Sequence, residues 1–377
     1  MSKTVQNLSA SCLVSSPFDE ETVRRAAEAC LQRLGKDPDL VFAFVSSDYR
    51  EYLPTFLESL QIDGHARSIA GGSGCGLIGV GKEQENISGF SLLFLTLPST
   101  KLTVTTKAPV TAYAATLVLA RSQAAALESI LRYRREENCS EPWVGGCITG
   151  GPDHDGLFLF DESGIVAEEA LFVQMEGGVR VVPLSAPGCR PIGQPFIITE
   201  AKGHDVLSLS QREPLDLLEE TFEALGTELQ REAEGHIFAG LAIDEETEHF
   251  HAGDFRIHQI VGATLHDGRL RLEAPARTGQ TLQFLWRDPL AAEMHLRSVC
   301  EEIKAMEGAP FASMLFAGKG RGRALFGVDD RNVATFEEVF GKLPVTGIHS
   351  YGEFAGTRSD LIPQSQSVSA ALFYPAE

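Results

Sequence analysis

A glycine-rich stretch early in the chain restricts the fold more than any other feature of this sequence. Residues 69–85 read IAGGSGCGLIGVGKEQE, with six glycines between positions 71 and 81. Because glycine lacks a Cβ atom, such a run marks a tight turn or a close approach of another backbone or a ligand. Three interpretations arise: a nucleotide site, a tight strand-to-strand crossing, or a loop whose N–H groups line a site for another small ligand.

The two nucleotide patterns in this stretch lack the setting that their chemistry needs. The G-x-G-x-x-G pattern must begin a helix that binds pyrophosphate, but Gly79 and Gly81 interrupt any helix and a strand-like GFSLLFLTL follows. The G-x-x-x-x-G-K pattern needs a Ser or Thr next, and Glu83 stands there. We therefore predict no nucleotide cofactor and interpret the stretch as a close-approach loop that lines a cleft.

The composition excludes several classes of partner. The 377 residues include 52 acidic and 32 basic side chains, a net charge of −20, which repels nucleic acid and anionic membrane surfaces. The longest apolar runs fall short of the ~20 residues of a membrane span, and the N-terminus lacks the apolar core of a signal peptide. Seven scattered cysteines without C-x-x-C indicate reduced thiols. We expect a cytoplasmic protein with no nucleic-acid or membrane partner.

Helical and strand patterns alternate only loosely along the chain. Helices are expected at 20–34, 49–61, about 112–137, from Pro214, and from Pro289 after an Asp288 N-cap. Many short strands lie between them, and turn sequences such as Asp267-Gly268 join some into hairpins. We predict an α+β fold of mixed, largely antiparallel β-sheets with helices on the outside, in two packed domains, 1–212 and 213–377.

Four stretches, in this order, resemble the FIST family, named for F-box and intracellular signal transduction proteins. They are GGSGCGLIGVGKEQE, APGCRPIGQPFIITEAKG, HAGDFRIHQIVGA with TGQTLQFLWRD, and MLFAGKGRGRALFG with VTGIHSYGEFAG. The resemblance implies a FIST N-like domain followed by a FIST C-like domain, and a sensory module that binds small ligands such as amino acids and acts with a signalling partner. This chain departs from the family at GEFAG, where a GEIGP-type ending is usual, and at Gln364, where a histidine is expected.

The stretches that carry the resemblance supply polar groups suited to an amino acid. A ligand with a carboxylate and an ammonium group needs arginine or backbone amides on one side and an acid on the other. We therefore predict one ligand site between the two halves, formed by Gly71, Gly72, Ser73, Gly74, Gly76, Arg190, Asp254, Arg287, Arg321 and Glu353. Arg287, Arg321 and Glu353 are expected to face the glycine loop across one cleft.

No catalytic set can be assembled from the sequence. Cys75, Cys147 and Cys189 each follow a glycine, but no histidine is assigned to any of them as a base. His249 and His251 could share one face of a strand, but no third metal ligand is specified. We predict a binding protein without enzymatic activity, metal or cofactor. Two alternatives stay open: a cysteine-dependent hydrolase or transferase, and a protein-interaction scaffold.

Overall fold

The computed structural model describes residues 8–108, 115–122, 125–126, 141–150, 156–233, 235–245, 250, 254–357, 361 and 364–376. The chain forms two compact units: the first comprises residues 1–185, 296–363 and 367–377, and the second comprises residues 186–295 and 364–366. The division at residue 213 does not coincide with these units. The reason is strand pairing, because β4 (Gly76–Gly79) pairs with β22 (Val345–Ser350), far along the chain.

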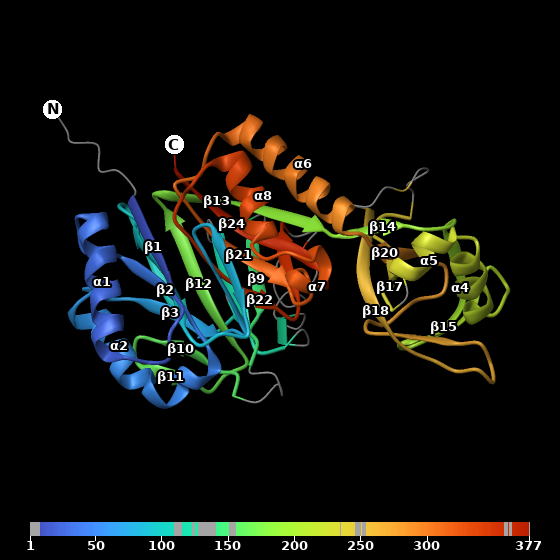
Figure 1. Ribbon diagram of the computed structural model, residues 1–377, viewed down its shortest axis with the longest axis horizontal. Helices are drawn as coiled ribbons and strands as arrows, with labels where there is room; N and C mark the ends of the chain where they lie inside the picture. The colour runs from blue at the N-terminus through green and yellow to red at the C-terminus, as the bar shows by residue number, and fades with distance from the viewer. Residues whose placement is uncertain are drawn as a thin grey trace. The chain divides into compact units, whose positions relative to one another are not determined.

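The first unit begins with a six-stranded sheet covered by helices (Figure 1). Its strand order is β1-β6-β2-β3-β10-β11, with bounds Leu8–Val14, Phe90–Thr96, Leu40–Val45, Ile69–Ser73, Leu159–Asp161 and Gly164–Val166. The covering helices are α1 (Glu20–Leu34) and α2 (Leu53–Ile62), the latter preceded by the 3-10 turn η1 (Ser47–Tyr52). Because successive side chains of a strand point to opposite faces of the sheet, β2 directs Val41, Ala43 and Val45 toward the helices. Phe42 and Phe44 pack on the opposite face.

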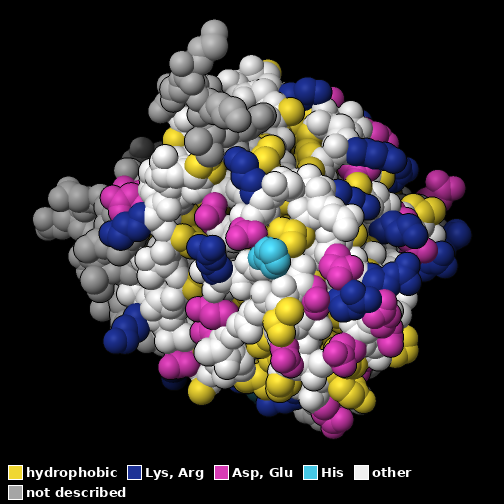
Figure 2. Space-filling model, turned by 90° about the vertical axis from the view of Figure 1, so that its left-hand side faces the viewer, with side chains coloured by type: hydrophobic (Ala, Val, Ile, Leu, Met, Phe, Trp, Pro, Cys, Tyr) yellow, Lys and Arg dark blue, Asp and Glu magenta, His cyan; other side chains and the backbone are white. Residues whose placement is uncertain are grey.

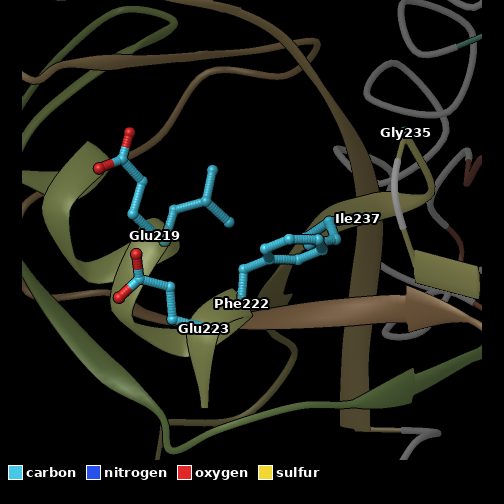
Figure 3. Close-up of a pocket in the computed structure, with 6 residues that line it drawn as sticks. Glu219, Phe222, Glu223, Gly235 and Ile237 are labelled. Carbon is cyan, nitrogen blue, oxygen red and sulfur yellow. The ribbon is translucent and has the colours of Figure 1, made fainter. Parts of the chain in front are cut away.

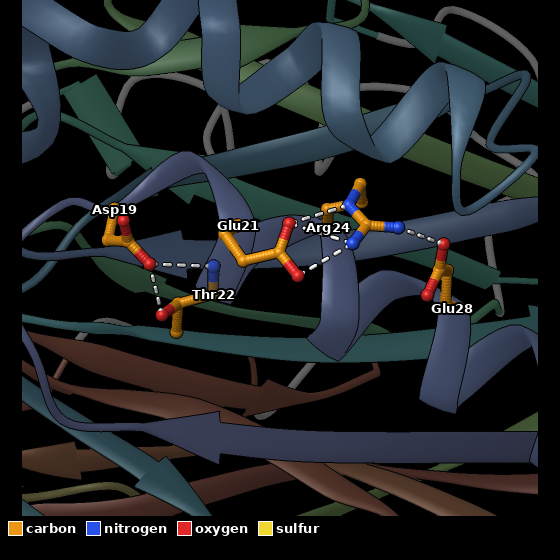
Figure 4. A network of polar contacts seen from close by, with 5 residues as sticks. All are labelled: Asp19, Glu21, Thr22, Arg24 and Glu28. Atoms are coloured by element: carbon orange, nitrogen blue, oxygen red, sulfur yellow. Dashed lines mark hydrogen bonds and ion pairs between the residues drawn. The ribbon is translucent and has the colours of Figure 1, made fainter.

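Helix α1 has a well-defined start and end, and Figure 4 shows the polar contacts of its first turns. The Asp19 carboxylate accepts hydrogen bonds from the amide and hydroxyl of Thr22, which satisfies one of the free N–H groups of the first turn. Arg24 pairs with Glu21 and Glu28, one turn away on each side. Gly35 ends the helix in the left-handed conformation, at φ 71°. These signals are local, so the predicted helix at 20–34 is confirmed.

Two further sheets complete the first unit. One has the order β13-β24-β21-β22-β4-β5, with the remaining bounds Val179–Pro187, Ser367–Pro375, Ala312–Gly318 and Lys82–Glu85. The other has the order β23-β9-β8-β12-β7, with bounds Glu353–Gly356, Trp143–Cys147, Ala115–Ala120, Ala170–Gly177 and Thr100–Thr105. Apolar side chains of all three sheets form one buried core, with Phe44, Phe316 and Leu117 as representatives. The core therefore depends on both halves of the sequence.

Helices also cover the sheet that contains β21. They are α6 (Pro289–Glu307), α7 (Arg323–Phe326) and α8 (Arg331–Phe340). Arg297 of α6 pairs with Glu338 of α8, and the Lys304 ammonium group donates to the carbonyl of Val339. These contacts hold the C-terminal part of α6 beside α8.

The second unit is a small, closed sheet. Its strand order is β14-β20-β15-β16-β19-β18-β17, and an additional pairing of β17 with β20 closes six of these strands into a ring. The bounds are Cys189–Pro191, Thr281–Arg287, Phe196–Lys202, Asp205–Leu209, Leu270–Leu272, Phe255–Ala263 and Ile237–Ala242. Closure leaves few unpaired strand edges and encloses an apolar core that includes Leu241, Leu272 and Phe284. Helices α4 (Pro214–Glu223) and α5 (Thr227–Ala233) accompany this sheet.

The structure confirms the α+β class with mixed and antiparallel sheets. It corrects the first part of the helix expected at about 112–137, because Ala115–Ala120 is strand β8 between β9 and β12, whereas most of the remaining residues of that prediction lie outside the described ones. The sequence ATLVLA is apolar except for Thr116 and is buried on both faces, and such a short run fits a buried helix or strand equally well. Figure 2 shows acidic and basic side chains intermixed on one face of the molecule, which leaves no continuous cationic surface among the described residues there.

Candidate functional site

The glycine-rich stretch forms three strands, β3, β4 and β5, rather than a nucleotide loop. Gly71, Gly72 and Ser73 end β3, a turn follows, and Gly76 begins β4, so no helix starts here. A Cβ atom on Gly71 would lie 2.1 Å from the Ala43 carbonyl oxygen, and one on Gly76 would lie 2.7 Å from the His349 ring. The glycines are therefore required by close packing against neighbouring strands and side chains.

The backbone N–H groups in this turn are used within the protein. Ser73 donates to the carbonyl of Phe158 at 2.9 Å, and Gly74 donates to the carbonyl of Val45 at 2.8 Å. The N–H of Cys75 donates to the Thr149 hydroxyl at 2.7 Å. This corrects the expectation that the amides of Ser73 and Gly74 bind a ligand, because sheet formation already engages both donors.

Several strand ends meet beside this turn. Strands β21 and β22 are parallel, and Gly318 pairs with Ser350 at the end of both. Continuing the antiparallel register of β4 by two residues brings Cys75 level with Ser350, and continuing that of β24 by one residue brings Ser367 level with Gly318. The carboxyl ends of parallel strands are common positions for ligands in mixed and parallel sheets. This edge of the first unit is therefore the candidate site.

We refer to the polar residues at this edge as the strand-end cluster: Cys75, Lys319, Ser350, Tyr351, Glu353 and Ser367. Glu353 is fully buried, and its Oε1 accepts from the N–H of Ser367 at 3.0 Å. The hydroxyl groups of Ser350 and Ser367 are also buried, and neither makes a hydrogen bond within the described part of the chain. A buried hydroxyl without a partner is uncommon in proteins and requires an explanation, such as a bound ligand.

Lys319 and Cys75 lie on the more exposed side of the cluster. The Lys319 ammonium group contacts the Tyr351 hydroxyl and lies 4.7 Å from the centre of its ring. Partial burial opposes the charge of Lys319, but the hydrogen bond to Tyr351, together with the nearby Cys75 and Glu85, raises its pKa. Lys319 is therefore a stable cation beside a partly exposed thiol.

Thr149 connects the cluster to the glycine turn, and sequence reasoning missed it. Its hydroxyl accepts from Cys75 and donates to the carbonyl of His349 at 3.0 Å, while its carbonyl accepts from the Ser73 hydroxyl at 2.9 Å. The position of Thr149 just after a predicted strand, in VGGCITG, was the available signal.

Arg321 belongs to a buried ionic network. We define this network as Glu83, Arg321, Asn332 and His349, each at most 5% exposed. Arg321 Nε donates to Asn332 Oδ1 at 3.2 Å, and Asn332 Nδ2 donates to Glu83 Oε2 at 2.9 Å. His349 Nε2 lies 3.3 Å from the same Glu83 oxygen. Arg321 is close in sequence to Lys319 of the strand-end cluster, but its side chain contacts the buried ionic network.

Glu83 is the centre of the buried ionic network. Burial favours its neutral form, but the contact with His349, the Asn332 amide and the N–H of Val333 outweigh burial and hold its pKa below the usual range. The sequence identified Glu83 only as the residue that disrupts a phosphate loop. Its structural role depends on α8 and β22, which lie more than two hundred residues further along the chain.

A cavity of about 460 Å³ lies next to Glu83 at the edge of β5. Its lining combines both signs of charge and consists of Lys82, Glu83, Gln84, Glu85, Asn86, Ile87, Arg323, Asp329 and Asp330. Arg323 pairs with Asp329, and its N–H donates to Glu85 at 3.0 Å. The charge of Glu85 also helps to raise the pKa of Lys319, so both positive and negative groups surround the strand-end cluster.

The other predicted site residues lie in the second unit. Arg190 lies 3.4 Å from Asp288 and stacks over Trp286, with 4.7 Å to the ring centre. Arg287 donates to Gln366 at 3.0 Å, and partial burial lowers its pKa. Asp254 immediately precedes β18, and its carbonyl accepts from Ile243. Whether Arg190, Asp254 and Arg287 share one site with Glu353 stays a prediction.

Asp288 confirms the predicted start of α6. Its Oδ1 accepts from the amides of Leu290 at 2.9 Å and Ala291 at 3.3 Å, directly before the helical turn that Pro289 begins. The carboxylate therefore acts as an N-cap. The Asp288 carboxylate also lies beside Arg190, so it contacts both the helix start and this guanidinium group.

The described residues contain neither a metal-binding cluster nor a membrane-spanning helix. No group of three or more His, Cys, Asp or Glu side chains there could hold a metal ion. His249 and His251 lie outside the described residues. Within the same ranges, no helix has the length and apolar character needed to cross a membrane.

Comparison with known proteins identifies two adjoining domains. The FIST N domain matches residues 39–212, and the FIST C domain matches residues 214–356. Uncharacterized proteins of Mycobacterium bovis and Mycobacterium tuberculosis are 32% identical to the chain over 231 residues. This alignment covers 61% of the chain and 60% of each relative, so the similar region spans less than two thirds of their length.

Proposed function

Because this chain belongs to the FIST family, whose domains are associated with signal transduction and small-ligand sensing, we propose that it is a sensory protein for an amino-acid-like molecule. The strand-end cluster is the proposed ligand site. The observation that carries this proposal is the pair of buried, unbonded hydroxyls of Ser350 and Ser367 next to the buried carboxylate of Glu353. Polar groups at such burial are normally hydrogen-bonded, and a bound ligand supplies the missing bonds.

The chemistry of the cluster matches a zwitterion. Glu353 is an acceptor for an ammonium group, and Lys319 offers a positive charge to a carboxylate. The hydroxyls of Ser350 and Ser367 can donate or accept, so they suit either end of the ligand. Binding that engages β21, β22 and β24 together changes the relative stability of conformations in which these strands differ, as a sensor requires.

A thermal-shift screen of amino acids, short peptides and nucleotides tests the proposed site. We expect at least one amino acid or close analogue to raise the melting temperature, because a ligand that binds only the native state stabilises it. In the double variant Ser350→Ala and Ser367→Ala, the affinity for that ligand should fall about tenfold, since two lost hydrogen bonds of roughly 0.7 kcal/mol each account for this factor. Isothermal titration calorimetry measures the change directly.

The Ser313→Ala variant provides a matched control. Ser313 is also fully buried and its hydroxyl also lacks a partner among the described residues, but it lies near the opposite end of β21. Removing an unsatisfied hydroxyl leaves the fold intact, so all three substitutions should preserve stability. A screen without any stabilising amino acid, or a double variant that binds as tightly as Ser313→Ala, contradicts the proposal.

We also propose that the chain binds without catalysing a reaction. The rival function is a cysteine-dependent hydrolase or transferase, and Cys75 is its best candidate because it is partly exposed and lies near Lys319. Catalysis by a thiol needs a base within hydrogen-bonding reach. No hydrogen bond joins the Cys75 thiol to the His349 ring in the described ranges of the chain.

Labelling with an iodoacetamide probe distinguishes the two functions. We expect Cys75 to be alkylated because it is accessible, at a rate no greater than that of the same residue in unfolded protein. Although Cys75 belongs to the strand-end cluster, the Cys75→Ser variant should retain most of the thermal shift produced by the ligand, because serine keeps a small polar side chain at this position. Alkylation of Cys75 in the native protein many times faster than in the unfolded chain supports the enzyme instead, and mass spectrometry of the labelled peptides locates the reactive residue.

A further inference from the structure

An apolar cavity opens beside helix α4 in the second unit (Figure 3). Its volume is about 280 Å³, and its lining consists of Leu218, Glu219, Phe222, Glu223, Gly235 and Ile237. Leu218 and Phe222 are one helical turn apart, so they lie on the same face of α4. Figure 3 shows Phe222 directed toward Ile237 of β17, while the carboxylates of Glu219 and Glu223 project away from the apolar side chains.

The surroundings of this cavity are acidic. Helix α4 reads PLDLLEETFE, with four carboxylates and no basic side chain. Glu220 is paired with Arg212, but Glu219 and Glu223 take part in no ion pair within the described residues. Both are exposed at the edge of the cavity. The local charge therefore favours a ligand that carries positive groups around an apolar centre.

The size of the cavity indicates one inserted side chain. Sites for complete small molecules usually have volumes from about 300 to 1,000 Å³, and this cavity lies below that range. Docked helices commonly insert single apolar anchors into grooves of a partner, with charged residues at the rim that select the partner. The half-buried Leu218, Phe222 and Ile237 supply the apolar contact for such an anchor.

We propose that this face of α4 docks a basic amphipathic segment of a partner protein. An apolar side chain of the partner occupies the cavity, and flanking Lys or Arg residues pair with Glu219 and Glu223. The docking surface lies entirely in the second unit and does not depend on the ligand site proposed for the first unit. It would give a sensory protein a surface for transmitting its state to another protein.

Fluorescence anisotropy with a designed peptide tests this surface. The probe is a labelled helix-forming peptide of about 18 residues, composed of leucine and lysine at helical spacing. A second peptide keeps every lysine and replaces each leucine with serine, which controls for the general attraction of cations to a chain of net charge −20. We expect the leucine–lysine peptide to bind at least tenfold more tightly than the serine–lysine peptide.

Charge reversal then locates the contact. The double variant Glu219→Lys and Glu223→Lys should weaken binding of the leucine–lysine peptide at least tenfold. Asp216→Lys with Glu228→Lys is the matched control, because both residues are exposed, lie outside the cavity and change the net charge equally. This control should alter the affinity less than threefold, and circular dichroism confirms that both variants are folded.

Three results would overturn the proposal. Equal binding of the two peptides shows attraction by net charge alone. Equal effects of the two double variants show that the peptide does not use this cavity. Full displacement of the peptide by octylamine at equal concentration shows that the cavity selects a small aliphatic amine rather than a protein segment.

Discussion

The Glu83→Ala variant is expected to lose about 3–5 kcal/mol of the unfolding free energy of the first unit, because removing one partner of a buried charged pair leaves the others uncompensated. Glu83 is 5% exposed and accepts from Asn332 at 2.9 Å and from Val333 at 2.6 Å. His349 lies 3.3 Å away and is itself buried. Alanine leaves these groups without their acceptor.

Urea unfolding measures this loss when each unit has its own reporter. The chain has two tryptophans, Trp143 in the first unit and Trp286 in the second, so 5-fluorotryptophan gives one NMR signal for each. The Trp143 signal should shift to lower urea in Glu83→Ala. Glu85→Ala, two residues along the same strand but partly exposed, is the control and should change stability by less than about 1 kcal/mol.

The Glu83 carboxylate also makes the stability of the first unit sensitive to acid. Because the folded pKa of Glu83 is lowered, the stability that it provides is present above the unfolded pKa of about 4.3 and is lost as the pH falls through the folded value. Glu83→Gln removes this contribution while keeping much of the side-chain volume. A Glu83→Ala protein as stable as the native one would show that the buried ionic network is not formed in solution.

The second unit is expected to lose about 3 kcal/mol between pH 6.5 and about 4 through His258 alone. Burial, and to a lesser extent the charge of Arg256, lower the pKa of this histidine to about 4. The unfolded chain takes up a proton near pH 6.5, whereas the folded unit resists protonation until about pH 4. The unfolded state therefore binds more protons in this window, so stability falls as the pH is lowered and is constant above it.

The Trp286 fluorine signal follows this unit through urea titrations across the same pH window. His258→Leu replaces the imidazole with an apolar side chain that never ionises, so its stability should change little from pH 6.5 to about 4 on this account. His266→Leu, at an exposed position of the same unit, is the control and should retain the native pH dependence. An identical pH dependence in native and His258→Leu proteins would refute the assignment.

Local signals in the sequence determined much of the secondary structure and the family. Asp19 and Gly35 bound α1, Pro214 begins α4, and Asp288 with Pro289 begins α6, because capping and proline geometry involve only neighbouring residues. The ordered FIST-like stretches identified the family, which the matches over 39–212 and 214–356 establish. The glycine density also indicated close packing before any partner strand was known.

Tertiary structure alone decided which residues form the sites. Strand β8 appeared helical in the sequence because an apolar run does not reveal that β9 and β12 pair on its two sides. The boundary at residue 213 separates the two matched domains. Strand β4 pairs with β22 and β9 pairs with β23 across this boundary, so the compact units follow a different division. Glu83, Thr149 and Ser367 acquire their roles from partners distant in sequence. Hydrogen bonds and burial between distant segments form only when the chain folds, so sequence spacing could not specify them.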